Sequence, residues 1–351
     1  MTPTYVYGIL PAGGPATYGV AGVGEEGPIY SVSRGDLAAL VSPSPRTDYR
    51  GLQRDEAVGY LMAHQRVVER VMQTSALLPV KFGTVLPDES WVRTLLEQGE
   101  HRFRAALERC AGRTQMEVVV LWDLQEVFQE IGAEEPIARL KAQVTTHAGE
   151  DTTAERITVG RLVQASLQGR LTALHARLLA SLQEVGPDLV VNPPMDDSVV
   201  ANVALLVDEA GRGALERRLE LLDEDFQGHL HFRCVGPLPP YSFATVEAQV
   251  PSFELVDEAR RRLGLGEAVT PDEIKRAYRR QGRQLHPDVN REDPEADAHM
   301  AELTRAYDLL LAYAESQARE AENARAVACR FDRQTVERTV LIGVRSQQVA
   351  A

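Results

Sequence analysis

Apolar residues recur at two different spacings in the first third of the chain. Alternation with aromatic and β-branched residues predicts strands, and apolar residues three and four positions apart predict helices. The predicted strands are residues 4–10, two strands within 29–42 that meet at a turn, and residues 77–87. The predicted helices are residues 54–74 and 88–110. These elements predict an N-terminal α+β domain at residues 1–113.

The middle of the chain has its own order of strands and helices. The elements expected there are a strand (116–122), two helical stretches (about 134–146 and 154–185), two strands within 187–209, a helix (211–226) and a strand (228–243). The order β-α-β-β-α-β is that of ferredoxin-like domains. We therefore predict a ferredoxin-like domain at residues 114–250, with a long helical insertion that forms an arm.

The C-terminal part of the chain changes to a helical pattern. Helices are expected at residues 252–266, 270–285 and 298–317. The middle helix begins with a capping box, in which Thr270 is the N-cap, Pro271 is the first residue and Glu273 closes the box. We predict a helical module at residues 252–316 and a tail at 317–351, which opens polar and then becomes strand-like.

Composition and charge narrow the classes of function. The chain has 351 residues, of which 44% are hydrophobic, and a net charge of −13, which argues against general binding to nucleic acid or anionic membranes. Its three cysteines stand in no CxxC spacing, which favours a reducing compartment over a disulfide or zinc framework. No apolar run approaches the roughly 20 residues of a membrane span, and the N-terminus lacks the basic segment of a signal peptide. We expect a soluble, cytoplasmic protein.

One glycine pattern suggests a phosphate site, but its context argues against it. The stretch GVGEEG (22–27) fits G-x-G-x-x-G. That pattern holds a pyrophosphate where its glycines follow a strand and open a helix. Pro28 and a predicted strand follow here, so we interpret the stretch as a flexible turn and expect no cofactor.

Two further groups could belong to a metal or acid–base site. His229 and His231 lie on one face of a predicted strand, but Cys234 falls on the opposite face and no third ligand is near in sequence. The acidic groups Asp196-Asp197 and Asp223-Glu224-Asp225 lie in a loop and near a helix end, without a neighbouring base. We expect no metal site and no catalytic residue. An enzyme site on the second domain stays an alternative, which would require these groups to converge in a pocket.

The loop after the helix at 270–285 begins with His286, Pro287 and Asp288. No nucleophile or further ligand neighbours this triplet, so neither a catalytic dyad nor a metal site fits it. The preceding helix carries the basic residues Lys275, Arg276, Arg279, Arg280 and Arg283. Its arginines follow the spacing of one helix face, opposite the apolar positions that should pack on the next helix. Such a basic stripe is either a solvated surface or a docking face for an acidic partner.

Residues 252–313 resemble a J-domain. The stretch TPDEIKRAYRRQGRQLHPDVNREDPEADAHMAELTRAYDLL matches its second helix, its HPD loop and its third helix. The resemblance implies binding to a DnaK-type chaperone and stimulation of its ATP hydrolysis. It assigns the stimulating role to His286, Pro287 and Asp288, and the docking role to the basic stripe. Gln281 stands where the family usually has an apolar residue, and Gly282 replaces a common Ala, so a less stable helix is expected.

The first 250 residues resemble the gas vesicle protein F/L family. Four stretches carry the resemblance in the same order: TYVYGIL (4–10), LLPVKFGTVLPDE (77–89), VVNPPMDDSVVANVALLVD (190–208) and FRCVGPLPPYSF (232–243). The resemblance implies a non-enzymatic accessory protein of gas vesicle assembly that binds the hydrophobic shell protein and other vesicle proteins. The Pro-rich stretch GPLPPYSF (236–243) is expected either to contact a partner or to pack between domains.

The two resemblances together imply a vesicle accessory protein that recruits a DnaK-type chaperone. The alternative is a J-domain co-chaperone for an unrelated client, with the front domains as the substrate binder.

Overall fold

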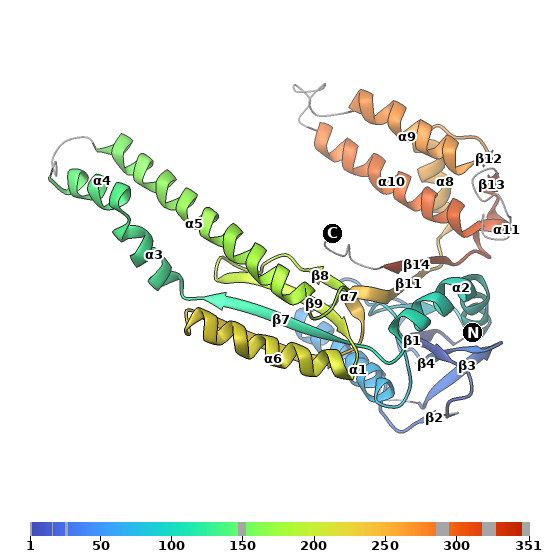
Figure 1. Ribbon diagram of the computed structural model, residues 1–351. Coiled ribbons are helices and arrows are strands. Elements are labelled where there is room, and N and C mark those ends of the chain that lie inside the picture. The colour runs from blue at the N-terminus through green and yellow to red at the C-terminus, as the bar shows by residue number, and fades with distance from the viewer. Residues whose placement is uncertain are drawn as a thin grey trace. The chain divides into compact units, whose positions relative to one another are not determined.

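The computed structural model describes residues 2–15, 17–24, 27–146, 152–285, 295–317 and 328–345 (Figure 1). It consists of helices and antiparallel sheets, as expected for an α+β chain. Its contacts divide into two units, the first combining residues 1–111 with 244–345 and the second formed by residues 112–243. None of the helices in these described ranges is long and apolar enough to cross a membrane.

The sheet of the first unit has the strand order β2-β3-β4-β1-β5, and β6 also pairs with β1. Its strands are β1 (Thr4–Pro11), β2 (Thr17–Tyr18), β3 (Ile29–Arg34), β4 (Leu37–Pro43), β5 (Leu78–Pro79) and β6 (Val85–Leu86). β1 is buried along almost its whole length because it lies between β4 on one side and β5 and β6 on the other. The predicted strand at 4–10 and the strand pair within 29–42 are confirmed.

The prediction of a single strand at 77–87 is wrong, because a turn divides this segment into β5 and β6. In this turn the backbone N–H of Thr84 donates to the carbonyl of Lys81 at 3.2 Å. Gly83 has a φ of +80°, a left-handed conformation that side chains disfavour. The turn allows both halves to pair with β1. The turn was not predicted because the apolar alternation typical of a strand continues through Val80 and Phe82.

Helices α1 (Arg54–Met72) and α2 (Glu89–Cys110) accompany this sheet, and both were expected. α2 begins after Asp88, whose carboxylate accepts hydrogen bonds from the backbone N–H groups of Ser90 and Trp91. The buried faces of the two helices include Val67, Val68 and Val71, and Val92, Leu95, Leu96 and Phe103. Because α2 packs on β1, β3 and β4, a hydrophobic core lies between this helix and the sheet.

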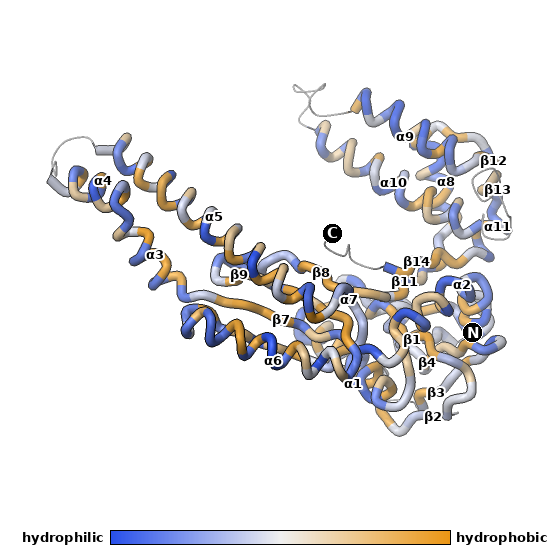
Figure 2. The backbone as a smooth tube through the Cα atoms, viewed as in Figure 1, coloured by the Kyte–Doolittle hydropathy of each residue, from blue (hydrophilic) through white to orange (hydrophobic). Residues whose placement is uncertain are grey.

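The second unit is built on an antiparallel sheet with the strand order β10-β7-β9-β8. Its strands are β7 (Thr114–Trp122), β8 (Leu189–Val191), β9 (Val199–Val207) and β10 (Leu230–Leu238). Helix α6 (Glu209–Phe226) connects β9 to β10 and buries Leu215 and Leu222. The core also takes up apolar side chains of β7 and β9, which carry hydrophobic colour in Figure 2.

Between β7 and β8 the chain forms the predicted arm. Its helices are α3 (Leu124–Ala133), α4 (Glu135–Thr146) and α5 (Thr153–Gln183), and both α3 and α4 pack on α5 (Figure 1). Helix α3 is not among the elements predicted from the sequence; the carboxylate of Asp123 caps its start. Val127 of this helix packs on the core of the unit and Ile131 is fully buried, whereas Phe128 is exposed.

The helical module of the first unit contains α8 (Phe253–Arg262), α9 (Pro271–Leu285) and α10 (Ala296–Gln317), and its three helices confirm those expected. Strands β12 (Ala268–Val269) and β13 (Cys329–Arg330) pair beside them, and the short helix α11 (Arg333–Val336) follows. The module's core includes four residues of the tail: Cys329, Phe331, Val336 and Leu341. The described part of the tail, residues 328–345, is therefore packed against the helices.

Two strands connect this module to the rest of its unit. After the short helix α7 (Tyr241–Ala244), β11 (Thr245–Gln249) leads into the module, and β14 (Leu341–Arg345) leaves it antiparallel to β11. The backbone N–H of Lys81 donates to the carbonyl of Val246 at 2.8 Å. On the tail side, Nη1 of Arg102 in α2 donates to the carbonyl of Ile342 at 2.9 Å. These bonds attach the ends of the module to the α/β part of the first unit.

Candidate functional site

The helix α9 begins with the capping box that its sequence predicts. The backbone N–H of Thr270 donates to Oε2 of Glu273 at 2.8 Å, and the backbone N–H of Glu273 donates to Oγ1 of Thr270 at 3.3 Å. The backbone N–H and the hydroxyl of Thr270 both donate to this carboxylate and hold the pKa of Glu273 below its usual value. Two backbone N–H groups that have no partner within the helix are thereby hydrogen-bonded, and this fixes where α9 begins.

The apolar face of α9 packs on α10. Ile274 and Ala277 are buried in a core with Leu303, Ala306 and Leu310. The rings of Tyr278 and Tyr307 stack at a centroid distance of 4.3 Å, and the hydroxyl of Tyr278 lies 3.1 Å from that of Thr304. The predicted packing of the two helices is confirmed. It fixes which face of α9 points away from the core.

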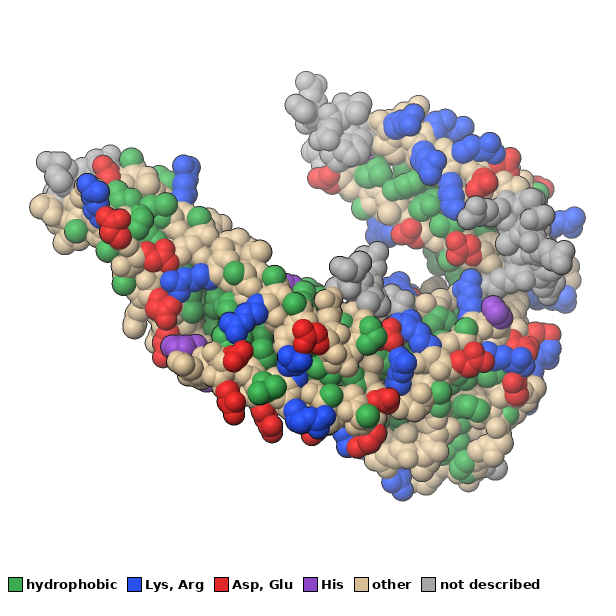
Figure 3. Space-filling model, in the orientation of Figure 1, with side chains coloured by type: hydrophobic (Ala, Val, Ile, Leu, Met, Phe, Trp, Pro, Cys, Tyr) green, Lys and Arg blue, Asp and Glu red, His purple; other side chains and the backbone are tan. Residues whose placement is uncertain are grey.

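The opposite face of α9 is basic and open to solvent. Arg276, Arg279, Arg280 and Arg283 are exposed, and Lys275 is half-buried. Arg276 lies 3.9 Å from a carboxylate oxygen of Glu273. Within the described part of the chain, the other four basic residues have no carboxylate within ion-pair distance. Figure 3 shows blue side chains gathered over α9. This face can therefore offer several cationic groups to an acidic surface.

The triplet His286, Pro287 and Asp288 lies outside the described residues, between the end of α9 at Leu285 and the start of α10 at Ala296. The two departures from the J-domain pattern lie inside α9. Gly282 is buried, and a Cβ at this position would lie 3.5 Å from Cε of Met300, which is an ordinary packing distance. The side chain of Gln281 reaches the region of Gly264, beyond the end of α8.

The remaining candidate groups do not converge. Among the residues that the structure describes, no cluster of three His, Cys, Asp or Glu side chains could hold a metal ion. The acidic pair Asp196-Asp197 takes part in local bonding, with Oδ1 of Asp196 accepting from the backbone N–H of Ser198 at 2.8 Å. Gly22 and Gly24 lie in a connection that leads to strand β3, and its described residues form no helix. In GPLPPYSF, Pro239, Pro240 and Phe243 are buried and pack, whereas Gly236 and Pro237 are exposed.

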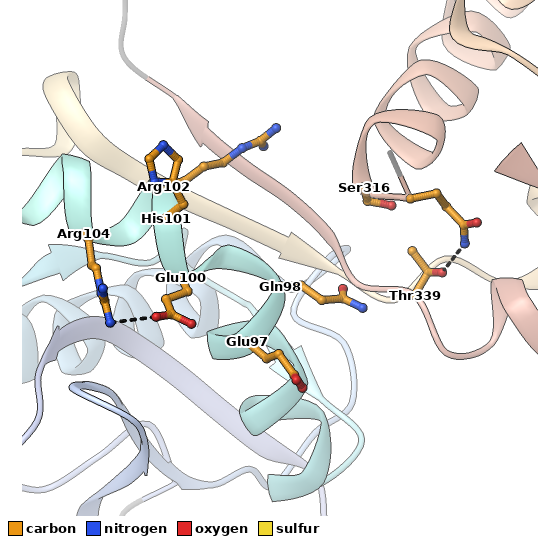
Figure 4. A pocket seen from close by; sticks show the side chains of 9 residues that line it. Glu97, Gln98, Glu100, His101, Arg102, Arg104, Ser316 and Thr339 are labelled. Carbon is orange, nitrogen blue, oxygen red and sulfur yellow. Dashed lines mark hydrogen bonds and ion pairs between the residues drawn. The ribbon is translucent and has the colours of Figure 1, made fainter. Parts of the chain in front are cut away.

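A polar pocket of about 780 Å³ lies between α2 and the tail side of the module (Figure 4). Glu100 and Arg104 form an ion pair at 2.7 Å, and Nε2 of Gln317 donates to Oγ1 of Thr339 at 3.1 Å. Because these groups pair with one another, they are less available to hold a ligand.

An apolar groove of about 390 Å³ lies at the base of the arm in the second unit. It is lined by Trp122 of β7, residues of α3 and α5, Phe226 at the end of α6, and His229 and Leu230. Of the polar residues singled out from the sequence, His229 lies here, whereas His231 and the two acidic groups do not line it. Sequence reasoning missed this groove because it missed α3. The signal that was available is Asp123 as an N-cap before Val127 and Ile131.

Similarity to known proteins shows to which family the chain belongs. The family model described as "Gas vesicle synthesis protein GvpL/GvpF" matches residues 3–245. The chain belongs to the GvpL/GvpF family. Gas vesicle protein F of Streptomyces sp. (strain CB03234) is 30% identical over 68% of this chain and 98% of its own length. Gas vesicle protein L of the same strain is 31% identical over 69% of this chain and 92% of its own length.

Solved structures support the same fold for the GvpL/GvpF part. The crystal structure of GvpF from Anabaena sp. PCC7120 aligns with a TM-score of 0.59 and 24% identity, over 69% of this chain and 98% of that one.

The GvpL/GvpF part is fused to a DnaJ domain, which matches at residues 261–320. The chaperone protein DnaJ of Carboxydothermus hydrogenoformans is 48% identical over 14% of this chain and 13% of its own length. Both resemblances predicted from the sequence are confirmed.

Proposed function

We propose that this chain is a non-enzymatic accessory protein of gas vesicle assembly that brings a DnaK-type chaperone to the vesicle shell protein. The observation that carries the proposal is the fusion of a GvpL/GvpF body with a DnaJ domain whose basic helix face is exposed. In this proposal Lys275, Arg276, Arg279, Arg280 and Arg283 dock on the chaperone. His286, Pro287 and Asp288 stimulate its ATP hydrolysis.

The physical advantage of the fusion is local concentration. A hydrophobic shell protein is prone to aggregate before it polymerises, because its apolar surface is unpaired. Linking the shell-binding part to the chaperone-binding part in one chain makes the second encounter intramolecular. The effective concentration then reaches the millimolar range for a short connection. β11 and β14 supply such a connection here.

The finer assignments form part of the same proposal. We place the protein in the cytoplasm, in association with gas vesicles, and expect the shell protein and other vesicle proteins as partners. We also classify the second unit as ferredoxin-like. That assignment is supported by its strand order β10-β7-β9-β8 and by its two helical crossovers.

ATP hydrolysis by the host's DnaK-type chaperone tests the docking face. The variant with both Arg279→Glu and Arg283→Glu should lose most of the stimulation that the full chain gives, because two cationic contacts become repulsive. Arg338→Glu reverses an exposed charge in the tail and serves as the matched control. His286→Gln should abolish stimulation without changing the docking face. Equal stimulation by the double variant and the control would contradict the proposed docking residues.

Vesicle yield in a producing strain tests the purpose of this docking. We expect fewer vesicles with His286→Gln and a normal yield with Arg338→Glu. If His286→Gln abolishes chaperone stimulation but leaves the yield unchanged, the chaperone serves another client, and the co-chaperone alternative replaces the proposal.

A further inference from the structure

We propose that the apolar groove at the base of the arm binds an amphipathic helix of a partner protein that carries basic residues beside its apolar stripe. The groove is lined by α3, α5 and the start of β10, all in the second unit. The inference rests on the proposed function for one point only, namely that the partner is a gas vesicle protein.

The floor of the groove is apolar and partly open. Trp122, Val127, Leu174, Phe226 and Leu230 line it. Trp122 and Leu230 are buried and form the base of the groove, whereas Val127, Leu174 and Phe226 are only partly buried and keep apolar surface toward its opening. The floor can therefore take apolar side chains of a partner.

The walls of the groove suit a helix. α3 contributes Glu126, Val127 and Glu130, and α5 contributes Arg170, Ala173 and Leu174. These residues lie within one helical turn on each wall, so two helix surfaces border the same space. The small side chain of Ala173 is exposed and leaves room on the α5 side. A third helix can insert its ridge of side chains between two such helices.

The rim of the groove selects for positive charge. Its carboxylates are Asp123, Glu126 and Glu130, whereas Arg170 is its guanidinium. Arg170 pairs with Glu130 at 2.5 Å and with Glu134 at 2.9 Å, so its charge is already compensated. The side chain of Glu126 is 61% exposed, and its oxygen lies 3.9 Å from Nδ1 of His229. Acidic side chains border apolar ones along this arm in Figure 3.

The combination of an apolar floor and an acidic rim identifies the chemistry of the occupant. Lys or Arg residues beside an apolar stripe would pair with Glu126 and Asp123 while the apolar residues fill the floor. An acidic helix would place like charges against this rim. A wholly apolar segment would leave the rim carboxylates without partners.

Peptide binding to the full chain tests the inference. The probe is a fluorescent 18-residue helix of Leu and Lys with leucines along one face, and its companion has Glu in place of Lys. Ala173→Trp fills the groove from the α5 side. Ala176→Trp adds the same ring at an exposed position of α5 that does not line the groove. This control is needed because a chain with a net charge of −13 attracts any cationic peptide weakly.

We expect Ala173→Trp to weaken binding of the Leu/Lys peptide at least tenfold, and Ala176→Trp to change it less than twofold. Glu126→Lys should weaken the Leu/Lys peptide severalfold and strengthen the Leu/Glu peptide. The proposal is overturned if the two Trp variants bind alike, or if the Leu/Glu peptide binds the wild-type chain as well as the Leu/Lys peptide does. A wild-type dimer that Ala173→Trp dissociates would also overturn it, because a second copy would then be the occupant.

Vesicle formation separates this inference from the proposed function. If deleting the gene leaves vesicle yield unchanged, the proposed function fails while the peptide results still decide the chemistry of the groove. If deletion abolishes vesicles and Ala173→Trp does not, the groove does not bind a partner that assembly requires, and the inference fails while the proposed function stands.

Discussion

The buried imidazole of His64 should make the stability of the first unit depend on pH. His64 lies in α1 and is buried among the rings of Tyr5, Tyr7 and Phe82. Its Nδ1 lies 3.0 Å from the hydroxyl of Tyr5, whereas its Nε2 has no hydrogen-bond partner among the described residues. Burial lowers the pKa of His64 from its ordinary 6.5 to about 4, and the backbone of Val80 offsets only part of that effect.

The sign of the effect follows from the direction of the pKa shift. Because the folded pKa is lower, the unfolded chain binds the proton more readily, and acidification favours unfolding. The stabilising contribution is complete above the unfolded pKa and is lost as the pH falls through 6.5 towards 4. Each unit of pKa corresponds to about 1.4 kcal/mol, so the full loss is about 3 kcal/mol. About 2 kcal/mol of it falls between pH 7 and pH 5.

Urea unfolding at pH 7 and pH 5 measures this loss. Trp91 in α2 reports on the first unit once Trp122 of the second unit is replaced by Phe. In that background the protein with His64 should lose about 2 kcal/mol of its unfolding free energy between pH 7 and pH 5. His64→Gln should lose much less, because a Gln amide does not titrate. An equal loss in both proteins would refute the assignment of the pH dependence to His64.

Three further predictions concern the module and the cysteines. Gly282→Ala should stabilise the module by about 1 kcal/mol in thermal unfolding followed by circular dichroism, because its Cβ has room, whereas Gly264→Ala should destabilise it at a φ of +64°. Phe331→Ala should cost the module about 3 kcal/mol in urea unfolding, because this tail residue is buried and stacks on Tyr313; a negligible cost would contradict the tail's place in the core. A thiol reagent on the native protein at pH 8 should label the exposed Cys234 first. Burial raises the pKa of Cys329 to about 11, so it should react only on unfolding. Mass spectrometry of the labelled peptides measures the order of labelling, and labelling of Cys329 before Cys234 in the native protein would contradict the prediction.

The parts of the fold that local sequence predicts well are those with one dominant periodicity. The α9–α10 pair is an example, since the spacing of Ile274, Ala277 and Tyr278 directs that face to α10, and the Thr270 capping box fixes where α9 begins. The exposed basic face of α9 was predictable because it is the complement of that apolar face.

Features that depend on distant partners were not predictable. The turn at Gly83 divides β5 from β6 because both must reach β1, and that pairing joins residues far apart in the sequence. The place of Phe331 in the module's core and the register of β14 on β11 have the same cause. The groove needs α3, α5 and β10 together, and no single segment carries a signal for it.

The pairing of β11 with β14 gives residues 250–340 the topology of one very long hairpin loop. An unstructured loop of that length would cost about 3 kcal/mol more to close than a four-residue turn. The folded module avoids this cost, since it holds its own two ends in antiparallel register. The same site could therefore accept another small domain whose ends lie side by side, or a short turn, with β11 still paired to β14. A DnaJ domain can in this way be gained or lost without redesign of the α/β sheet beside it.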